Sequence, residues 1–545
     1  MKHTKSILAL FVIIGLFVAC SKERLDVRNP NLPTPESAST ENGILALGQG
    51  VYYSGFRGLD TKFNDGVPGY FWTGAIGLHD IMGDVVGAEA ANWFINQIGC
   101  PDEVVLDNNS VVNNPQNPNK QYELLRSVND NANGGANPTF HEWANMYSLN
   151  NASNNILTIV ENVTFAQDAD VKKKTIQAWA YWWKGFAYSR IGSIYYAGLI
   201  NNEPNAATNT YVTKEAIIAE ANANLDKAAS LLSSLPDGGA YESIMKRLIP
   251  DYIYSASKIP TPAEWKRNIN TLKARNILVN TPLASMSAGQ WASIKSLTDD
   301  GIGATDQPFI GLSNDNGDIW APLGLMGGKT TGTPGSVTYK VSERLVQEFK
   351  DGDKRKENNF NQEAAPWIGN SDRGTIFNTR WGLANNGNGL AGVIVYGSRD
   401  AGASTLYLAG SYAENALMSA EVKIYSGDVD GGLAIIDAVR TSQGAGLAAT
   451  SGTGLIADAA KEELRRERRC ALAFQSVAFY DARRWGITEK GGPGRTGCVV
   501  VDAAGGINTN ATIRYNFLDY WDVPANELAY NPAGAGSAPT ENPKR

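Results

Sequence analysis

The chain has 545 residues, and 43% of them are hydrophobic, which is enough for a large buried core in one domain or in two fused ones. The formal net charge is −7 at pH 7. Because no basic stripe interrupts this acidic composition, no nucleic-acid partner is expected.

The N-terminus predicts a secreted, lipid-anchored protein. Lys2 and Lys5 precede an apolar run over residues 7–18, as in a secretory signal peptide of residues 1–20. This run is too short for a comfortable membrane-spanning helix. The alanine directly before Cys20 resembles the end of a bacterial lipobox, in which Cys20 is acylated and becomes the first residue of the mature protein. Several acyl chains would make the anchor stable. The alternative is an ordinary signal peptide in which Cys20 is accidental.

A tether and a helical scaffold are expected next. Residues 21–40 are rich in Pro, Asn and Ser, which is typical of a flexible linker between a lipid and a fold. Helical spacing of apolar residues then dominates wherever the pattern is clear. The stripes lie within residues 143–160, 179–190, 218–232, 265–278, 409–420 and 433–439. Thr261 and Glu264 form a capping box around Pro262, which marks the start of one helix.

These stripes come in neighbouring pairs of about 20 residues with alanine-rich faces, a pattern that suits tetratricopeptide-like helical hairpins. The predicted fold class is therefore mostly α, with long loops and a few short strands. The helical scaffold is expected mainly over residues 140–290 and 405–486. Residues 300–400 and 487–510 are rich in Gly, Asn, Thr and Pro and predict loops and short strands. The ligand-facing loops are expected mainly within residues 60–120 and 300–400, because binding residues often lie on loops held by a rigid frame.

Few residues of the chain favour metal or redox chemistry. Beyond Cys20 only Cys100, Cys470 and Cys498 remain, so at most one disulfide is possible. No CxxC spacing indicates a structural zinc site. Histidine chemistry would have to depend on His79 and His141, and a lone histidine on a helix is usually a polar residue with a structural partner.

No cofactor is expected. Residues 314–318 and 428–431 contain closely spaced acidic side chains, but neither segment has the ligand spacing of a calcium loop, and Asp428 also suits a helix N-cap. A structural calcium ion stays the alternative. Residues 323–330 end like a phosphate-binding loop but lack its first glycine. No GxSxG motif is present, and no carboxylate pair stands out as a glycosidase pair. The sequence therefore predicts a protein that is not an enzyme.

Aromatic residues in loop-like sequence give the best indication of a ligand. Five tryptophans lie among Gly, Asn and Asp, namely Trp72, Trp93, Trp320, Trp367 and Trp381. Sugar rings pack their C–H faces on flat aromatic side chains, while polar side chains bond the hydroxyl groups. The predicted ligand-binding residues are Trp72, Trp93 with Asn92 and Asn96, and Trp320 with Asn316 and Asp318. The alternative is that each of these tryptophans pins its loop to the scaffold.

The segment Arg465 to Gly486, RRERRCALAFQSVAFYDARRWG, carries a family resemblance. In a helix through this segment, Leu464, Ala471, Leu472 and Phe479 share one face, and the charged residues fall largely on the other. Trp485 and its aromatic neighbours are expected to pack as core, and the Arg/Asp pairs to lock local turns. The segment resembles the C-terminal signature of SusD/RagB-family nutrient-binding lipoproteins, from its Leu-Ala-Phe to its closing aromatic-Asp-x-Arg-Arg-Trp-Gly. It departs from that pattern at residues 475, 477 and 478.

Further similar pieces occur within residues 175–192, 215–235, 272–275 and 523–532, so the resemblance covers nearly the whole mature chain. It implies a single SusD-like domain over residues 41–545. It also implies a lipoprotein of the outer membrane that faces the cell exterior and binds an oligosaccharide without covalent chemistry. The partner would be a TonB-dependent, SusC-like transporter, on which the lipoprotein acts as a lid.

Two alternatives stay open from the sequence. The same fold binds peptides in some members of that family, which an acidic or apolar groove would favour over exposed aromatic residues. A secreted polysaccharide hydrolase on a helical scaffold is the second alternative, and it would require turnover of a polysaccharide.

Overall fold

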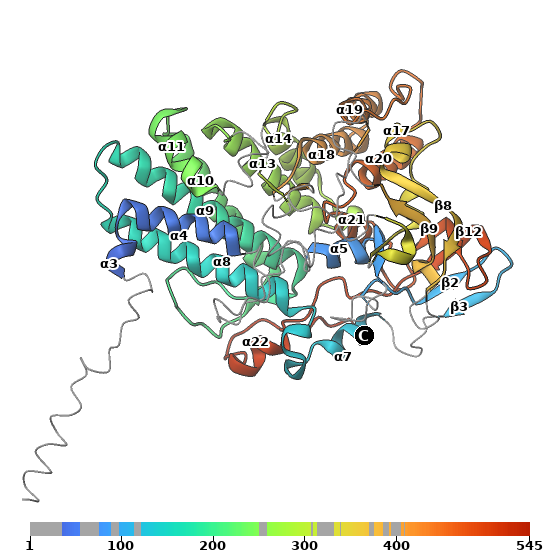
Figure 1. Ribbon diagram of the computed structural model, residues 1–545, viewed down its shortest axis with the longest axis horizontal. Helices are drawn as coiled ribbons and strands as arrows, with labels where there is room; N and C mark the ends of the chain where they lie inside the picture. The colour runs from blue at the N-terminus through green and yellow to red at the C-terminus, as the bar shows by residue number, and fades with distance from the viewer. Residues whose placement is uncertain are drawn as a thin grey trace, which may run out of the picture.

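The structure is a computed structural model of the whole chain. It describes residues 35–54, 76–88, 98–113, 121–249, 259–306, 309–312, 332–337, 339–369, 375–384, 392–393, 405–407 and 409–544. Helices dominate this part of the chain and the strands are short, which confirms the predicted mostly α fold class. The long helices lie on one side of the molecule and most strands on the other (Figure 1).

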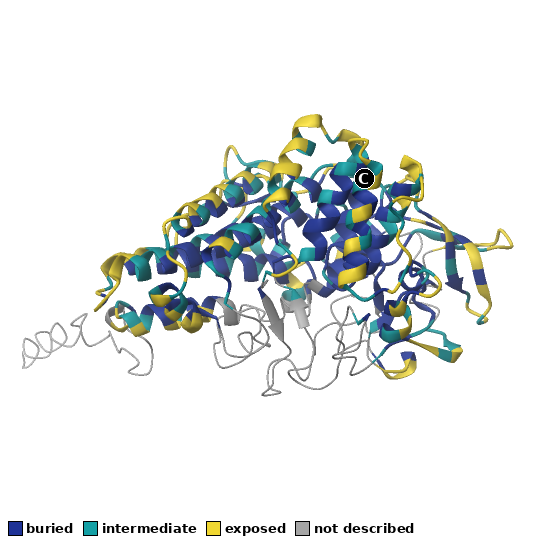
Figure 2. Ribbon diagram, turned by 90° about the horizontal axis from the view of Figure 1, so that it is seen from above, coloured by how far each residue is buried: buried dark blue, intermediate teal, exposed yellow. Residues whose placement is uncertain are grey.

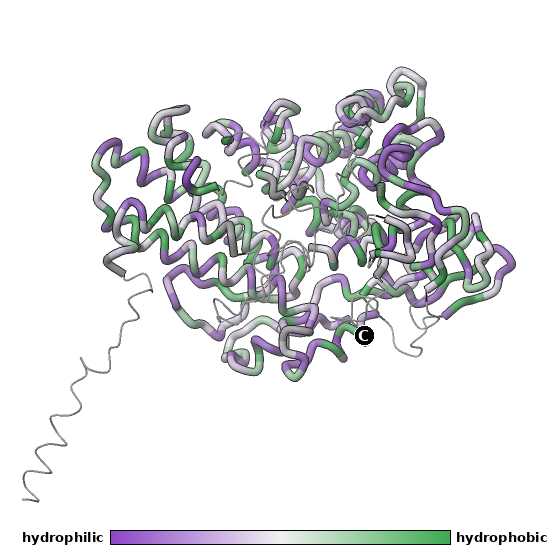
Figure 3. The backbone as a smooth tube through the Cα atoms, viewed as in Figure 1, coloured by the Kyte–Doolittle hydropathy of each residue, from purple (hydrophilic) through white to green (hydrophobic). Residues whose placement is uncertain are grey.

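The first helical body is built around one long central helix, α9 (Ala169–Ile194). It packs between α8 (Phe140–Ile159) and α10 (Lys214–Leu232), and α4 (Glu41–Ser54) and α11 (Gly239–Leu248) also pack against it (Figure 1). Short α3 (Pro35–Ala38) packs against α4. Hydrophobic and hydrophilic residues alternate along these helices, as expected where each helix buries one face (Figure 3).

Large aromatic residues fill the centre of this body. Trp179, Trp182 and Trp183 of α9 are fully buried and pack edge-to-face with one another or with Trp265. Close approach of α10 requires Gly185, because a Cβ atom there would lie 2.6 Å from Cγ of Leu225. The apolar stripe expected over residues 179–190 therefore packs as core.

The second helical body contains two further hairpins. Helix α13 (Pro262–Val279) pairs with α14 (Ala288–Asp299), and α18 (Tyr412–Tyr425) pairs with α19 (Val429–Ser442). Helix α20 (Ala457–Ala471) packs on the second hairpin and is followed by short α21 (Ala478–Arg484). These neighbouring pairs confirm the expected helical hairpins.

Both sequence-based helix caps are present. Thr261 Oγ1 accepts a hydrogen bond from the backbone N–H of Glu264, and the Glu264 side chain accepts one from the N–H of Thr261. Asp428 caps α19 by accepting from the N–H of Gly431, and Lys423 donates to its other carboxylate oxygen. Asp428 therefore acts as the N-cap that its sequence context suggested.

The described strands form one larger sheet and several two-stranded ones. The four-stranded antiparallel sheet has the order β11 (Arg495–Val501), β12 (Ile507–Arg514), β2 (Glu103–Val105), β3 (Val111–Asn113). The pairs are β1 (Val86–Ala88) with β7 (Tyr339–Val341), β6 (Ile310–Leu312) with β10 (Thr405–Tyr407), β8 (Phe360–Trp367) with β9 (Thr379–Leu383), and β4 (Ala197–Gly198) with β5 (Val212–Thr213).

Short helices connect these bodies. The α-helices are α5 (Ile76–Met82), α7 (Gln121–Val128), α16 (Glu343–Val346), α17 (Lys354–Asn359) and α22 (Ala525–Tyr530). The 3-10 helices are η3 (Asn131–Ala136), η4 (Val160–Asn162), η5 (Leu283–Ser285), η6 (Pro334–Ser336) and η8 (Thr375–Phe377).

The charged face of α20 differs from the expectation. Leu464 and Ala471 are buried as predicted, but Glu467, Arg468 and Arg469 are buried as well. The helix is enclosed on its charged side too, and each of those charges meets an opposite one: Arg468 binds Asp481, Glu467 binds Arg355, and Arg469 lies beside Glu348. Buried charge is tolerated only when it is paired in this way. Burial therefore extends to both sides of α20. In the molecule as a whole, buried residues gather in the interior and exposed ones at the periphery (Figure 2).

Candidate ligand-binding site

The predicted ligand residues lie outside the described part of the chain. These are Trp72, Asn92, Trp93, Asn96, Asn316, Asp318 and Trp320, and Cys20 lies outside it as well. Their roles stay predictions. The segment 314–318, considered above for calcium, also lies outside it.

One described residue directly precedes one of these segments. Ala88 ends β1 and pairs with Tyr339, the first residue of β7. Residues 89–97, which include Trp93, follow Ala88 in the chain.

The other two loop tryptophans act as structural pins. Trp381 of β9 donates its Nε1–H to Glu343 Oε2 at 3.1 Å. The ammonium group of Lys340 lies 4.2 Å from the ring centroid of Trp367 on β8. These contacts attach the β8–β9 hairpin to α16 and β7, so the structural alternative holds for these two residues.

Three concavities meet at Trp485, immediately after α21. We call them the arginine pocket, of about 590 Å³, the tyrosine pocket, of about 550 Å³, and the bridging pocket, of about 230 Å³. Trp485 lines all three; Glu462 and Arg465 line both the arginine and bridging pockets, and Leu283 lines both the bridging and tyrosine pockets. Together they form the Trp485 groove. Two of these volumes fall within the range of sites for small ligands, which is about 300–1,000 Å³.

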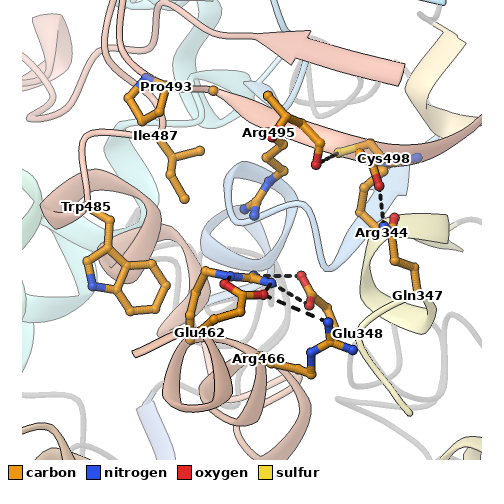
Figure 4. Close-up of a pocket in the computed structure, with 14 residues that line it drawn as sticks. Arg344, Gln347, Glu348, Glu462, Arg466, Trp485, Ile487, Pro493, Arg495 and Cys498 are labelled. Carbon is orange, nitrogen blue, oxygen red and sulfur yellow. Dashed lines mark hydrogen bonds and ion pairs between the residues drawn. The ribbon is translucent and has the colours of Figure 1, made fainter. Parts of the chain in front are cut away.

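The arginine pocket is framed by α16, α20 and β11 (Figure 4). Its arginines are Arg344 from α16, Arg465 and Arg466 from α20, and Arg495 from β11. Its apolar wall consists of Trp485, Ile487 and Pro493, on the opposite side in Figure 4 from Arg344 and Gln347. One pocket therefore offers an aromatic surface and several hydrogen-bond donors.

The tyrosine pocket has a different composition. Tyr520 lies between two cations: the guanidinium of Arg483 is 4.0 Å from its ring centroid and the ammonium of Lys214 is 4.8 Å from it. The Tyr520 hydroxyl donates to Asn280 Oδ1 at 3.0 Å. Such contacts fix the ring in place, as a rigid binding surface requires.

The position of Trp485 depends on a buried ion network. Arg484 donates to both carboxylate oxygens of Glu421, at 2.6 and 2.8 Å, and through Nε to Asp481 at 2.8 Å. Asp481 also accepts two hydrogen bonds from Arg468. The Arg484 guanidinium lies 4.7 Å from the Trp485 ring centroid. Gly486 then turns the chain with φ of 71°, a backbone conformation that favours glycine.

The expectation for the C-terminal segment is thus confirmed in part. Phe479 and Tyr480 are buried core residues, and the Arg/Asp pairs lock the turn after α20. Trp485 is half-buried: it packs against the main hydrophobic core, as expected, and its remaining surface borders the groove, which was not expected. A tryptophan within a charged signature gave no sign of this, because the groove is formed by elements far apart in the chain.

The electrostatics of the arginine pocket favour ionised carboxylates. Arg465 and Arg469 hold the pKa of Glu348 below its usual value despite the opposing effect of burial. Burial, together with repulsion from Arg495, lowers the pKa of Arg469 to about 10. Burial raises the pKa of the Cys498 thiol to about 11, so this thiol stays protonated near neutral pH.

The pKa shifts of Glu348 and Cys498 differ from those of a glycosidase acid and of an activated thiol. A glycosidase acid needs a carboxyl group with a raised pKa, whereas Glu348 is shifted in the opposite direction and is bonded twice by Arg465. The thiol of Cys498 is not activated as a nucleophile. Among the described cysteines, Cys100, Cys470 and Cys498 are all buried and free of disulfides.

The buried histidine His79 is structural. Its Nε2 lies 2.7 Å from Glu142 Oε2 and 3.1 Å from Arg190 Nη2, and burial lowers its pKa. The rings of Phe479, Tyr480 and Trp521 surround it. His141 is also buried in α8. Within the described residues, no group of three or more His, Cys, Asp or Glu side chains has the arrangement of a metal site.

Comparison with protein families shows a match to the SusD family model over residues 313–533. This range contains the whole C-terminal signature and most of the Trp485 groove. None of the curated proteins compared with the chain is similar to it in sequence.

Several solved structures share the fold at low sequence identity. A SusD-like carbohydrate binding protein from Bacteroides fragilis NCTC 9343 is 14% identical, with a TM-score of 0.55, over 90% of this chain and 98% of that one. A SusD superfamily protein from Bacteroides vulgatus ATCC 8482 is 15% identical, with a TM-score of 0.51, over 82% and 88% of the two chains. A second SusD-like protein from B. fragilis NCTC 9343 is 14% identical, with a TM-score of 0.51, over 83% and 94%. The likeness shows that this chain has the SusD-like fold.

Proposed function

We propose, from the match to the SusD family model over residues 313–533 and from the SusD-like fold, that the chain binds carbohydrate at the cell surface without cleaving it. The observation that carries the proposal is the half-buried Trp485, which borders three neighbouring concavities among arginine, tyrosine and asparagine side chains. Aromatic surfaces beside hydrogen-bond donors match the two-sided chemistry of a sugar ring. One protein with the same fold is described as carbohydrate binding.

The proposed binding is non-catalytic. In the arginine pocket, the carboxylate of Glu348 is ion-paired and the thiol of Cys498 is protonated. A hydrolase would need an acid and a base or nucleophile that are free to transfer protons.

The proposed cellular role is delivery of the glycan to a TonB-dependent, SusC-like transporter in the outer membrane. The N-terminal lipobox-like sequence at Cys20 supports an anchor by acyl chains, and the outward orientation follows from the family resemblance. In the part of the chain that the structure describes, no helix has the length and apolarity needed to span a bilayer.

The test is a binding screen of soluble residues 21–545 against glycans and peptides, with product analysis for every ligand that binds. We expect glycan binding without cleavage, and a loss of about tenfold or more in affinity for Trp485→Ala, as for a central aromatic contact. Tyr530→Ala is the matched control, because Tyr530 is an aromatic residue that is 85% exposed and does not line the groove.

The predicted loop residues are tested in the same screen with Trp93→Ala and Trp320→Ala. If these variants lose glycan binding and Trp485→Ala does not, the site lies on the loops and not in the Trp485 groove. If the protein binds peptides and no glycan, its proposed ligand is a peptide. If it cleaves any ligand, the proposal that it is not an enzyme is wrong.

A further inference from the structure

The arginine pocket carries more positive than negative charge. Four arginines and two glutamates line it, namely Arg344, Arg465, Arg466, Arg495, Glu348 and Glu462. Directly behind this lining, Arg469 and Asp84 add one charge of each sign. An excess of two positive charges therefore remains at a pocket that is open to solvent.

Arg495 is incompletely paired although its side chain is only 8% exposed. Its Nη2 donates to the carbonyl oxygen of Gly83 at 3.3 Å, while its Nε has no hydrogen-bond partner among the described residues. The nearest carboxylate oxygen, Asp84 Oδ2, is 3.6 Å from Nε and accepts instead from Arg344 Nε at 3.0 Å. The guanidinium of Arg495 points into the middle of the pocket (Figure 4).

A second unused donor lies on the α20 side of the pocket. Arg466 Nε is buried without a hydrogen-bond partner among the described residues, and the nearest carboxylate contact of its guanidinium is 3.9 Å, to Glu462. Glu462 is already bonded by Arg465 through two nitrogens. A buried donor without an acceptor costs free energy, so an anionic partner at this pocket would be favoured by both of these donors.

The backbone holds Arg495 rigidly toward the pocket. The pairing of β11 with β12 shifts register between Arg495 and Cys498, which is a β-bulge, and Gly497 within it has φ of 63°. The side chain of Gln347 spans the bulge, since its Nε2 donates to the carbonyl of Gly497 at 2.6 Å and its Oε1 accepts from the N–H of Val499 at 2.8 Å. Bulges of this kind redirect side chains and often occur beside functional sites.

The opposite wall of the pocket is apolar, with Trp485, Ile487 and Pro493. We propose that the arginine pocket binds an acidic sugar, whose ring packs against Trp485 and whose carboxylate or sulfate group accepts hydrogen bonds from Arg495 and Arg466. The planar guanidinium fork matches the oxygen pairs of both acid groups. That the ligand is a sugar rests on the proposed function, and that this sugar is acidic rests on the arginines.

The test is calorimetric titration of soluble residues 21–545 with two matched pairs of oligosaccharides. The first pair is trigalacturonate and its methyl-esterified, neutral form; the second is a sulfated carrageenan tetrasaccharide and its desulfated form. The pair with the larger difference identifies the acid group. We expect the acidic member of that pair to bind about tenfold tighter than the neutral one, the effect of one charged hydrogen bond. This advantage should shrink as salt rises, because ions screen it.

Two arginine variants and one control locate the effect. Arg466→Gln and Arg495→Gln should remove the preference for the acidic member, because each variant should weaken binding of the acidic member much more than binding of the neutral one. Arg466 is 30% exposed, so its replacement leaves the fold intact even if that of Arg495 does not. Arg514→Gln is the matched control, since Arg514 of β12 is 60% exposed and lies outside the pocket. It should change neither affinity.

The titrations distinguish failure of the acidic-sugar inference from failure of the proposed carbohydrate binding. If neutral and acidic members bind equally and Trp485→Ala weakens both, the proposed function stands and the acidic-sugar inference is wrong. If no oligosaccharide binds, both are wrong. Binding of inorganic sulfate without any oligosaccharide, lost in Arg466→Gln, would also refute both and leave an anion site that is unrelated to glycans.

Discussion

The buried ion network beneath Trp485 permits a quantitative prediction about stability. Glu421 and Arg484 are both fully buried and joined by two hydrogen bonds. In Glu421→Leu, Arg484 keeps only Asp481, which it shares with Arg468. Two charged hydrogen bonds of about 1.5–3 kcal/mol each are lost. This sum agrees with the cost of about 3–5 kcal/mol for breaking a buried pair from one side.

The measurement is thermal unfolding of soluble residues 21–545 by calorimetry. A chain of this size has an unfolding entropy of about 1 kcal/mol/K, so a loss of about 4 kcal/mol lowers the Tm by about 4 °C if the chain unfolds cooperatively. The double variant Glu421→Leu/Arg484→Met removes both charges and should recover part of the loss, because no unpaired arginine is left.

The matched control is Asp299→Ala. Asp299 bonds Lys295 across one turn of α14, and both side chains are more than half exposed, so this change should cost less than about 0.5 kcal/mol. A cost below about 1 kcal/mol for Glu421→Leu would refute the reasoning. The reasoning would also be wrong if the double variant Glu421→Leu/Arg484→Met lost as much stability as Glu421→Leu and Arg484→Met lose separately when added together.

Two further predictions concern the rest of the scaffold. Burial raises the pKa of the Asp80 carboxyl to about 7, above its value of 3.8 in the unfolded chain. Between these two values the folded protein holds a proton that the unfolded chain releases, so the free energy of unfolding falls as pH rises from about 4 to 7. Asp80→Asn should therefore raise the Tm more at pH 7.5 than at pH 4.5, and an equal change at both pH values would contradict this. At the contact of α9 and α10, Gly185→Ala should lower the free energy of unfolding by about 1–3 kcal/mol, because the added methyl group overpacks against Leu225. Gly50→Ala on α4 is the control: a Cβ there meets nothing within 4 Å, so this change should be neutral or stabilising. Chemical denaturation measures both.

Local sequence signals were sufficient for the helical scaffold. The capping box at Thr261, the N-cap at Asp428 and the tryptophans of α9 each depend on residues within a few positions of one another, and all three appear as expected. The burial of Arg468 and Glu467 was not predictable from helical periodicity. It depends on Asp481 and Arg355, which come from other elements, and periodicity alone assigns a charged helix face to solvent.

The Trp485 groove shows why a site of this kind escapes sequence analysis. Arg344 and Arg495 are separated by about 150 positions in the chain, and they meet because each lies near Asp84, a residue from a third region. In the sequence, Arg344 directly follows Glu343, whereas the acidic residues nearest to Arg495 are Glu489 and Asp502. Only the fold shows that Arg344 occupies the oxygens of Asp84 and leaves Nε of Arg495 without an acceptor. The proposed acid-binding site depends on an unsatisfied donor, which is a property of geometry that a motif of residue types does not encode.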